Sequence, residues 1–220
     1  AGKTTKFYTM DFPVKTIDMS AFTHATHLQT VTIPEGVATI RQSAFYSCTS
    51  LREVSFPESI TTIELAAFGQ CDSLESIVLP PNITEIATTL FFKCTSLRSV
   101  TIPASVTNID MTPFLECNKL TEITCLATTP PTLHMMAFYY MEQADITLYV
   151  PEEAVETYKA TPVWKDFDVQ AITGTGIRSI DNGQLIFDDD VWYDINGRHL
   201  DGKPNAKGVF IHEGRKVVIK

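Results

Sequence analysis

Residues 41–63 read RQSAFYSCTSLREVSFPESITTI, and close variants of this 23-residue block precede and follow it. Four residue types recur with the same spacing: Leu28, Leu51, Leu74, Leu97 and Leu120; Pro34, Pro57, Pro80 and Pro103; Phe22, Phe45, Phe68, Phe91 and Phe114; and Cys48, Cys71, Cys94 and Cys117. A fixed period over more than half of a chain indicates stacked copies of one small unit, each burying its apolar side against its neighbours. The sequence therefore predicts a repeat solenoid.

The block also outlines the conformation of one coil. Val54 and Phe56 alternate with Ser55, which predicts a short strand, and Pro57 ends it because proline cannot donate to a ladder. Between Ala44 and Leu51 the apolar residues stand three apart, which favours a single 3₁₀ or α turn. We expect three rows of branched aliphatic residues in the core: Val31, Val54, Ile77, Val100 and Ile123; Ile40, Ile63, Ile86 and Ile109; and Val37, Ile60, Ile83 and Val106.

The same register continues weakly towards the N-terminus. Four residues there precede members of the later rows by 23 positions: Tyr8, Met10, Val14 and Ile17. We therefore expect the chain to open in a degenerate coil without a polar cap. An uncapped end exposes apolar surface and a strand edge, so this pattern predicts either a shortened chain or a partner over the N-terminal end, self-association included.

The cysteines are expected to be core residues. Cys48, Cys71, Cys94 and Cys117 occupy one position of successive coils, and parallel side chains stacked in register point the same way, not at each other. Zinc is disfavoured because four sites strung along an axis cannot close a tetrahedron. Cys125 stands at a strand position held elsewhere by apolar residues. We therefore expect small, buried thiols, with no metal and no other cofactor.

Two phrases in this block resemble a known family. Ala44-Phe45-x-x-Cys48-x-x-Leu51, followed by a strand that ends at Phe56-Pro57, is similar to the leucine-rich repeats of BspA type. The resemblance covers residues 8 to about 170, with departures at Ala25, at Pro113 and at Thr89-Leu90. It implies a bacterial surface or secreted protein with a protein-binding or adhesive role.

The repeat changes near residue 134, where Phe138 follows Phe114 by 24 positions. A strand is expected over 146–150 and a helix over 151–159, with Val155, Tyr158, Trp164 and Phe167 closing the end of the stack. The predicted parts are a solenoid over residues 1–133, a terminal coil and helical cap over 134–171, and a small antiparallel β-module over 172–220.

The β-module is predicted from hairpin signals at Asn196-Gly197 and near Glu213-Gly214. It resembles C-terminal modules of secreted and surface proteins of Bacteroidetes-type bacteria. Some relatives of that module act as sorting signals for type IX secretion.

Composition narrows the class of partner. The formal net charge is −9, and residues 1–171 hold 10 Lys and Arg against 19 Asp and Glu, whereas residues 172–220 hold 7 of each. An acidic array repels phosphate backbones, so we expect no nucleic-acid partner. No run reaches the roughly 18 apolar residues of a membrane span, and no signal peptide is recognisable. We therefore expect Ala1 to be the start of a mature chain or of an excised piece, and the compartment is not directly readable from these residues.

The sequence offers little that resembles catalytic chemistry. The five histidines are His24, His27, His134, His199 and His212, and no constellation unites them. His24 and His27 have a spacing compatible with a metal, but nothing nearby completes a ligand set. Asp188, Asp189, Asp190 and Asp194 lack the alternating spacing of a calcium loop. No nucleophile elbow, phosphate loop or carboxylate pair is recognisable, so we expect no enzyme.

What remains is the surface of the solenoid. Outward strand positions should line one broad face, formed by Thr30, Thr32, Glu53, Ser55, Ser76, Val78, Ser99, Thr101, Glu122 and Thr124. The leading hypothesis is a secreted or surface-exposed protein, at the cell surface or outer membrane, whose face binds a host or matrix protein or a cell-surface glycan. The alternative is a structural spacer or assembly module with no dedicated ligand face.

Overall fold

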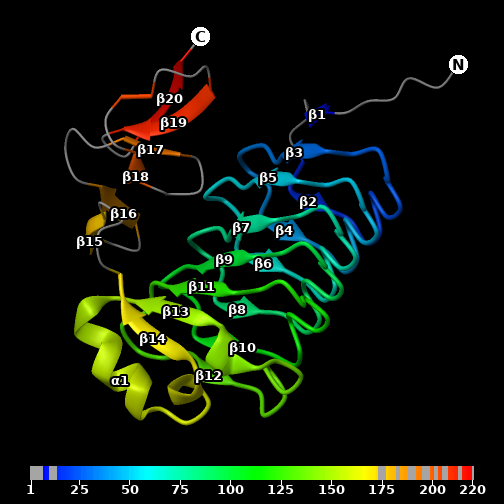
Figure 1. Cartoon of the computed structure of the whole chain (residues 1–220). Coiled ribbons are helices and arrows are strands. Elements are labelled where there is room, and N and C mark those ends of the chain that lie inside the picture. Colours follow the sequence, from blue (N-terminus) through cyan, green and yellow to red (C-terminus); the bar gives the residue numbers. More distant parts are fainter. Residues whose placement is uncertain are drawn as a thin grey trace, which may run out of the picture. The chain divides into compact units, whose positions relative to one another are not determined.

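The computed structural model (Figure 1) describes residues 7–9, 14–172, 177–181, 184–187, 192–194, 199–200, 203–204, 208–212 and 215–219. The chain folds into two compact units, Ala1–Gln170 and Ala171–Lys220. The first is a parallel β-solenoid, as predicted, with coils of about 23 residues. Its division into a solenoid over 1–133 and a cap over 134–171, and the start of the β-module at 172, stay predictions.

The first row of strands forms one side of the solenoid. Its members are β1 (Phe7–Thr9), β3 (Thr30–Thr32), β5 (Glu53–Ser55), β7 (Ser76–Val78), β9 (Ser99–Ile102), β11 (Glu122–Cys125), β13 (Thr147–Val150) and β14 (Asp168–Ala171). Parallel pairing places Tyr8 beside Val31 and Val31 beside Val54. Farther along, Ile77 pairs with Val100 and Val100 with Ile123. The predicted inward row is therefore confirmed, and the weak N-terminal register does continue the stack.

A second row of shorter strands forms another side of each coil. Its members are β2 (Thr16–Ile17), β4 (Thr39–Ile40), β6 (Thr62–Ile63), β8 (Glu85–Ile86), β10 (Asn108–Ile109) and β12 (Thr132–Leu133). They assemble into the parallel sheets β2-β4-β6 and β8-β10-β12. Ile40, Ile63, Ile86 and Ile109 are at most 2% exposed, so this row also belongs to the core.

The third side of each coil differs from the short helix that the sequence suggested. Residues 42–47 form consecutive hydrogen-bonded turns, and Ser43 and Ser47 have positive φ angles of 55° and 58°. The corresponding pair in the next coil is Ala66 and Gln70, with φ angles of 52° and 57°. A helical turn needs negative φ throughout. Apolar residues three apart are compatible with either conformation, which is why the spacing alone did not separate them.

The left-handed residues of this turn segment direct backbone groups towards the neighbouring coil. Ser43, Phe45 and Ser47 donate their N–H groups to the carbonyls of Leu65, Ala67 and Gly69, with N···O distances of 3.0, 2.8 and 2.8 Å. Equivalent bonds join Ala66, Phe68 and Gln70 to the coil that follows. The third side is therefore tied coil to coil like a sheet, although its backbone is not extended.

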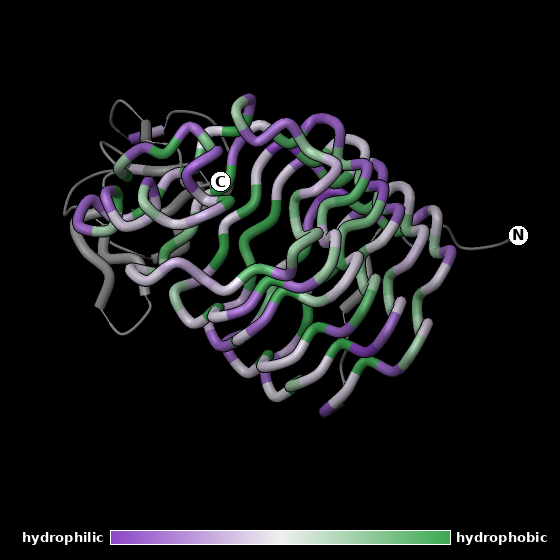
Figure 2. Tube along the Cα trace, turned by 90° about the horizontal axis from the view of Figure 1, so that it is seen from below, coloured by the Kyte–Doolittle hydropathy of each residue, from purple (hydrophilic) through white to green (hydrophobic). Residues whose placement is uncertain are grey.

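The interior holds two stacked rows that the sequence predicted. The rings of Phe45 and Phe68 lie 5.3 Å apart and nearly parallel, and the stack continues through Phe91 and Phe114 to Phe138. All five cysteines are buried free thiols. The Cys94 thiol donates to the Phe68 carbonyl, at 3.1 Å. Figure 2 shows hydrophobic positions, in green, recurring beside one another in successive coils.

Aromatic residues close the end of the stack. This region contains η1 (Gln143–Asp145), η2 (Glu152–Ala154), α1 (Val155–Ala160) and η3 (Trp164–Asp166). The buried Tyr158 hydroxyl donates to the Ala127 carbonyl at 3.0 Å, and the Trp164 indole N–H donates to the Pro131 carbonyl at 3.0 Å. Trp164 also packs edge-on against Phe138, with ring centroids 5.8 Å apart. The hydroxyl of Tyr158 and the indole N–H of Trp164 thus both have partners, as buried polar groups require.

The second unit is built from antiparallel strands, as expected. They are β15 (Ile177–Asp181), β16 (Gln184–Phe187), β17 (Trp192–Asp194), β18 (His199–Leu200), β19 (Gly208–His212) and β20 (Arg215–Ile219). β15 pairs with β16, and the other four form a sheet in the order β18-β17-β19-β20. His212 pairs with Arg215, and the predicted turn near Glu213-Gly214 lies outside the described residues. The predicted turn at Asn196-Gly197 and the residues Asp188, Asp189 and Asp190 lie outside the described residues.

The left-handed turn residues generate a first prediction. A non-glycine residue with positive φ costs roughly 1–2 kcal/mol, and His24 is exposed with a φ of 62°. We expect His24→Gly to raise the free energy of unfolding by about 1 kcal/mol in urea denaturation. His27, also exposed but without positive φ, is the matched control, and His27→Gly should lower it by about 0.5–1 kcal/mol. Equal losses in both variants would contradict the turn geometry.

The buried thiols generate a second prediction, for alkaline pH. Burial raises the pKa of Cys48 from 9.0 to about 11, and it also raises the pKa values of Cys71, Cys117 and Cys125. Between pH 9 and 11 the unfolded chain therefore loses protons that the folded chain keeps. Stability is then fully present below pH 9 and falls as the pH rises.

Urea denaturation from pH 7.5 to 10.5 tests this dependence. The free energy of unfolding should fall above pH 9, by up to about 1.4 kcal/mol per pH unit for each thiol. Cys71→Ala should flatten that fall, whereas Met135→Ser, which removes no titratable group, should not. A pH-independent free energy would show that the thiols ionise as readily in the fold as in the unfolded chain.

Candidate partner-binding face

The outward positions of the first strand row form a continuous surface, here called the strand face. It consists of Thr30, Thr32, Glu53, Ser55, Ser76, Val78, Ser99, Thr101, Glu122 and Thr124, all of them exposed or half-buried. The strands hold these side chains outward because alternate residues point to opposite sides of a sheet. Between them lie buried residues such as Val31, Ile77 and Val100.

Strand register arranges this face in two rows. In one row Ser76 pairs with Ser99 and Ser99 with Glu122; in the other, Val78 pairs with Thr101 and Thr101 with Thr124. Neighbouring parallel strands lie about 4.8 Å apart, so the side chains of each row stand in contact range of one another. Thr30 pairs with Glu53 and Thr32 with Ser55 in the neighbouring sheet. The structure therefore places the ten residues predicted from the sequence in two such rows.

Two residues extend the strand face beyond the sequence prediction. Thr147 pairs with Glu122, and Tyr149 pairs with Thr124. Both follow their partners by 25 positions instead of 23, so the 23-residue spacing does not identify them as members of this face. The alternation Ile146-Thr-Leu148-Tyr-Val150 was the available signal, because it marks a strand whose outward positions are these two residues.

The chemistry of the strand face is that of hydroxyl groups. Seven of the ten predicted residues are Ser or Thr, two are Glu, and Val78 is 50% exposed. Such a surface can donate and accept hydrogen bonds along its length. It lacks the Trp and Arg side chains that dominate binding hot spots, and Tyr149 is its aromatic residue.

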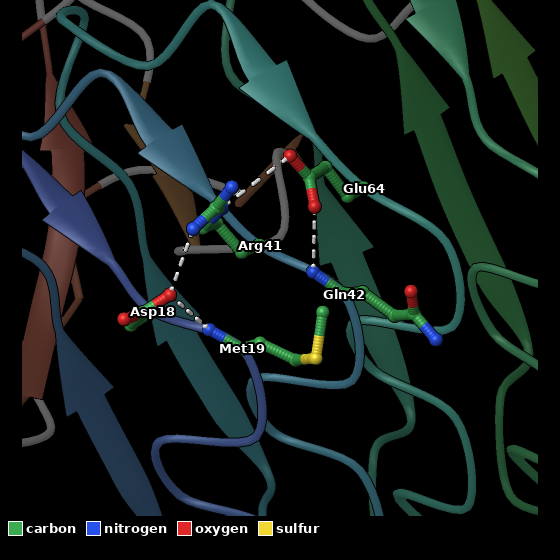
Figure 3. A network of polar contacts seen from close by, with 5 residues as sticks. All are labelled: Asp18, Met19, Arg41, Gln42 and Glu64. Carbon is green, nitrogen blue, oxygen red and sulfur yellow. Dashed lines mark hydrogen bonds and ion pairs between the residues drawn. The ribbon is translucent and has the colours of Figure 1, made fainter.

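A second polar arrangement lies on the other sheet, around β2, β4 and β6. Thr16, Asp18, Thr39, Arg41 and Glu64 line an open hollow of about 460 Å³. Figure 3 shows Arg41 between the two carboxylates: its Nη1 lies 3.1 Å from Asp18 Oδ1, and its Nε lies 3.9 Å from Glu64 Oε1. The hydrogen bond from the Met19 N–H holds the pKa of Asp18 below its usual value, and the neighbouring Arg41 adds a smaller effect in the same direction.

Asp18, Arg41 and Glu64 lie in three successive coils, and Arg41 pairs with both carboxylates. Glu64 also accepts the Gln42 N–H at 2.9 Å. Exposed ion pairs of this kind contribute about 0–1 kcal/mol each. The arrangement therefore works as a tie between coils, with no group left poised for proton transfer or nucleophilic attack.

The other side chains that could take part in catalysis or metal binding are isolated on the surface or buried. His24 and His27 are exposed, and the His134 Nδ1 accepts the Met136 N–H at 3.1 Å. Within the described residues, no group of three or more His, Cys, Asp or Glu side chains is arranged to hold a metal ion. Burial raises the pKa values of Cys71, Cys125 and Tyr158, which keeps these three core groups neutral.

The architecture defines a class of protein: a solenoid of coils of about 23 residues, in which rows of leucine, phenylalanine and cysteine stack from one coil to the next. The chain matches the family described as BspA type leucine rich repeat region, in six copies over residues 3–149. That match covers well over half of the chain, so the chain belongs to the BspA-type leucine-rich repeat family. A comparison with curated proteins finds no match.

Solved structures give the same fold. The chain is similar to a leucine-rich repeat protein of T. pallidum, with 33% identity and a TM-score of 0.50 over 52% of this chain and 53% of that chain. It is also similar to a leucine-rich cell surface protein of Faecalibacterium prausnitzii A2-165, with 32% identity and a TM-score of 0.53 over 55% of this chain and 32% of that chain. The chain thus spans about half of the first structure and a third of the second.

One more distant structure extends the likeness along the chain. The pneumococcal vaccine antigen PcpA is 21% identical, with a TM-score of 0.57 over 76% of this chain and 41% of that chain. At this identity the likeness concerns the fold alone. In the part of the chain that the structure describes, no helix is both long and apolar enough to cross a membrane.

Proposed function

We propose that this chain is a non-enzymatic, secreted or cell-surface leucine-rich-repeat protein that binds another macromolecule through its strand face. The observation that carries the proposal is the register of that face, whose outward side chains form two rows over β3-β5 and over the neighbouring sheet β7-β9-β11-β13. Repeat solenoids offer such extended surfaces to partners.

The partner that fits this face is a host or matrix protein, or a cell-surface glycan. Closely spaced hydroxyl groups suit either of them, because both present many hydrogen-bonding groups. The acidic excess of residues 1–171 disfavours nucleic acid. A cell-surface or outer-membrane location is supported by the likeness to the F. prausnitzii protein, which is described as a cell surface protein.

The second unit belongs to the same proposal. Its hairpins around β17, β19 and β20 follow the pattern by which residues 193–220 resemble C-terminal modules of Bacteroidetes-type secreted proteins. We propose that the module is a C-terminal tail of this kind, with a sorting signal for export and a purely structural tail as its two alternative roles.

A structural spacer or assembly module is the alternative function. It is favoured by the stack itself, because strand pairs join the coils within each sheet and turn-segment bonds such as that from Ala66 to Thr88 join one sheet's coils to the next, which stiffens the solenoid. In this case molecules would associate through the N-terminal end, where β1 begins the sheet order β1-β3-β5.

Charge reversal on the strand face separates the two functions. We expect Glu53→Lys/Thr101→Lys/Glu122→Lys to lower binding to immobilised matrix proteins or to a glycan array at least tenfold. The matched control is Glu35→Lys/Thr84→Lys/Glu85→Lys, which makes the same change of charge at exposed residues elsewhere on the coils and should bind like the wild type.

Sedimentation velocity on the same variants reports assembly. Equal loss of binding in both triple variants would show that binding depends on net charge and would contradict the proposal that the strand face is the binding surface. Concentration-dependent self-association that survives both variants, without binding to either array, would favour the spacer.

A further inference from the structure

Exposed apolar side chains gather on the turn segment, away from the strand face. Within the described residues, six of the seven large hydrophobic side chains that are well exposed belong to this side of the coils: Met19, Leu65, Met111, Met135, Tyr139 and Tyr140. The seventh is Val78, on the strand face. Scattered single apolar residues need no explanation, but an ordered set on one side does.

Four of these residues, Met19, Leu65, Met111 and Met135, occupy one position of the coil. Met19, Leu65 and Met111 stand two coils apart, with Gln42 and Thr88 in the coils between them. The backbone confirms the alignment, because Ser43 N–H donates to the Leu65 carbonyl and Thr89 N–H to the Met111 carbonyl, at 3.0 and 3.1 Å. Figure 3 includes Met19 and Gln42 from adjacent coils.

The row continues to Met135, because the pairing of Ile109 with Leu133 carries the register into the last coil. Five coil steps of about 4.8 Å make the row roughly 24 Å long. Its four apolar members are between 38% and 85% exposed.

A second apolar row lies four residues farther along the same segment. It begins at the polar Thr23, and from there it contains the half-buried Tyr46, Phe92 and Leu115 and ends at the exposed Tyr139. At Gly69, the member of this row between Tyr46 and Phe92, an added Cβ would lie 2.8 Å from the Tyr46 ring. The Tyr46 side chain therefore covers Gly69, and the row has no polar gap. We call the two rows together the apolar stripe.

The borders of the apolar stripe carry unequal charge. One border holds the carboxylates of Asp18, Glu64 and Asp110, each directly before a residue of the first row. The same border holds Arg41, which pairs with Asp18 and Glu64, and His134, which precedes Met135 and lies close enough to Asp110 to interact with it. Carboxylates are therefore in the majority at this border. The Thr88 hydroxyl, which donates to Asp110 at 2.6 Å, lowers the pKa of that carboxyl. At the opposite border, Lys93 and Glu116 neutralise each other at 3.5 Å. The stripe thus has one acidic border and one neutral border.

We propose that the apolar stripe is a docking surface for a protein segment that combines apolar side chains with lysine or arginine along one edge. Met, Tyr and Phe are enriched at the centres of protein interfaces, and an acidic border selects a basic partner over an acidic one. This surface is distinct from the strand face and goes beyond the proposed function.

A second copy of the chain fits this surface less well. A symmetric dimer would apply the same patch to itself. With the two-fold axis along the stripe, each acidic border would face a neutral border and gain no cation; with the axis across the stripe, the two acidic borders would face each other. Like charges in such a contact are unfavourable. The charge pattern therefore selects a different, basic molecule.

Two designed peptides test the proposal on the full chain. Both are 16-residue amphipathic helices of the same leucine pattern, one with lysine and one with glutamate at every polar position. In isothermal titration calorimetry at about 150 mM salt, we expect the Leu/Lys peptide to bind at least tenfold more tightly than the Leu/Glu peptide. Met19→Ser/Leu65→Ser/Met111→Ser should weaken Leu/Lys binding at least tenfold, whereas Val78→Ser should leave it within twofold.

Three results would overturn the proposal. Equal binding of the two peptides would remove the role of the acidic border, and unchanged binding by the triple serine variant would place the site elsewhere. A wild-type dimer in sedimentation velocity that the triple variant dissociates would make the second copy the occupant. Asp18→Asn/Asp110→Asn, which leaves every apolar side chain in place, should independently weaken Leu/Lys binding, so the test does not depend on the folding of the serine variant.

Discussion

The contact between one coil and the next is the interaction on which the rest of this structure depends. A 23-residue coil is too small to enclose its own apolar side chains, so Phe68 is buried only because Phe45 and Phe91 stack on its two faces. Backbone hydrogen bonds join the coils at the same time on the two strand rows and on the turn segment. The aromatic lid ends this stacking, because Trp164 packs edge-on against Phe138 and its indole N–H is satisfied by the Pro131 carbonyl of the preceding coil.

Stacking also decides what the surface offers. Every outward position becomes a row, so a single residue type repeated in the sequence becomes a continuous chemical surface. The strand rows carry hydroxyl groups from Ser99 and Thr101 and their neighbours, a surface suited to many hydrogen bonds. The turn segment carries Leu65, Met111 and Tyr139, a surface suited to apolar contact beside an acidic border. Two surfaces of such different character can serve different partners at once.

The sequence predicted the rows well and the turn segment poorly, for a physical reason. Burial restricts residues such as Phe45 and Cys71 to a few apolar types, so their spacing is visible in one sequence. The left-handed residues of the turn are Ser43, Ala66 and Thr89, none of them glycine, because inter-coil hydrogen bonds hold them there. Without that conformation, the outward direction of Leu65 or Met111 could not be inferred, and the apolar stripe was missed.

Deletion of one period tests the central claim most directly. Removal of residues 64–86 would join Ile63 to Ala87 and bring Phe45 against Phe91, whereas removal of residues 64–85 shifts every later side chain by one position. If each coil is the stacking unit, thermal denaturation followed by circular dichroism should give a cooperative transition for the first deletion and none for the second. A first deletion that fails to fold, or two deletions of equal stability, would contradict the account.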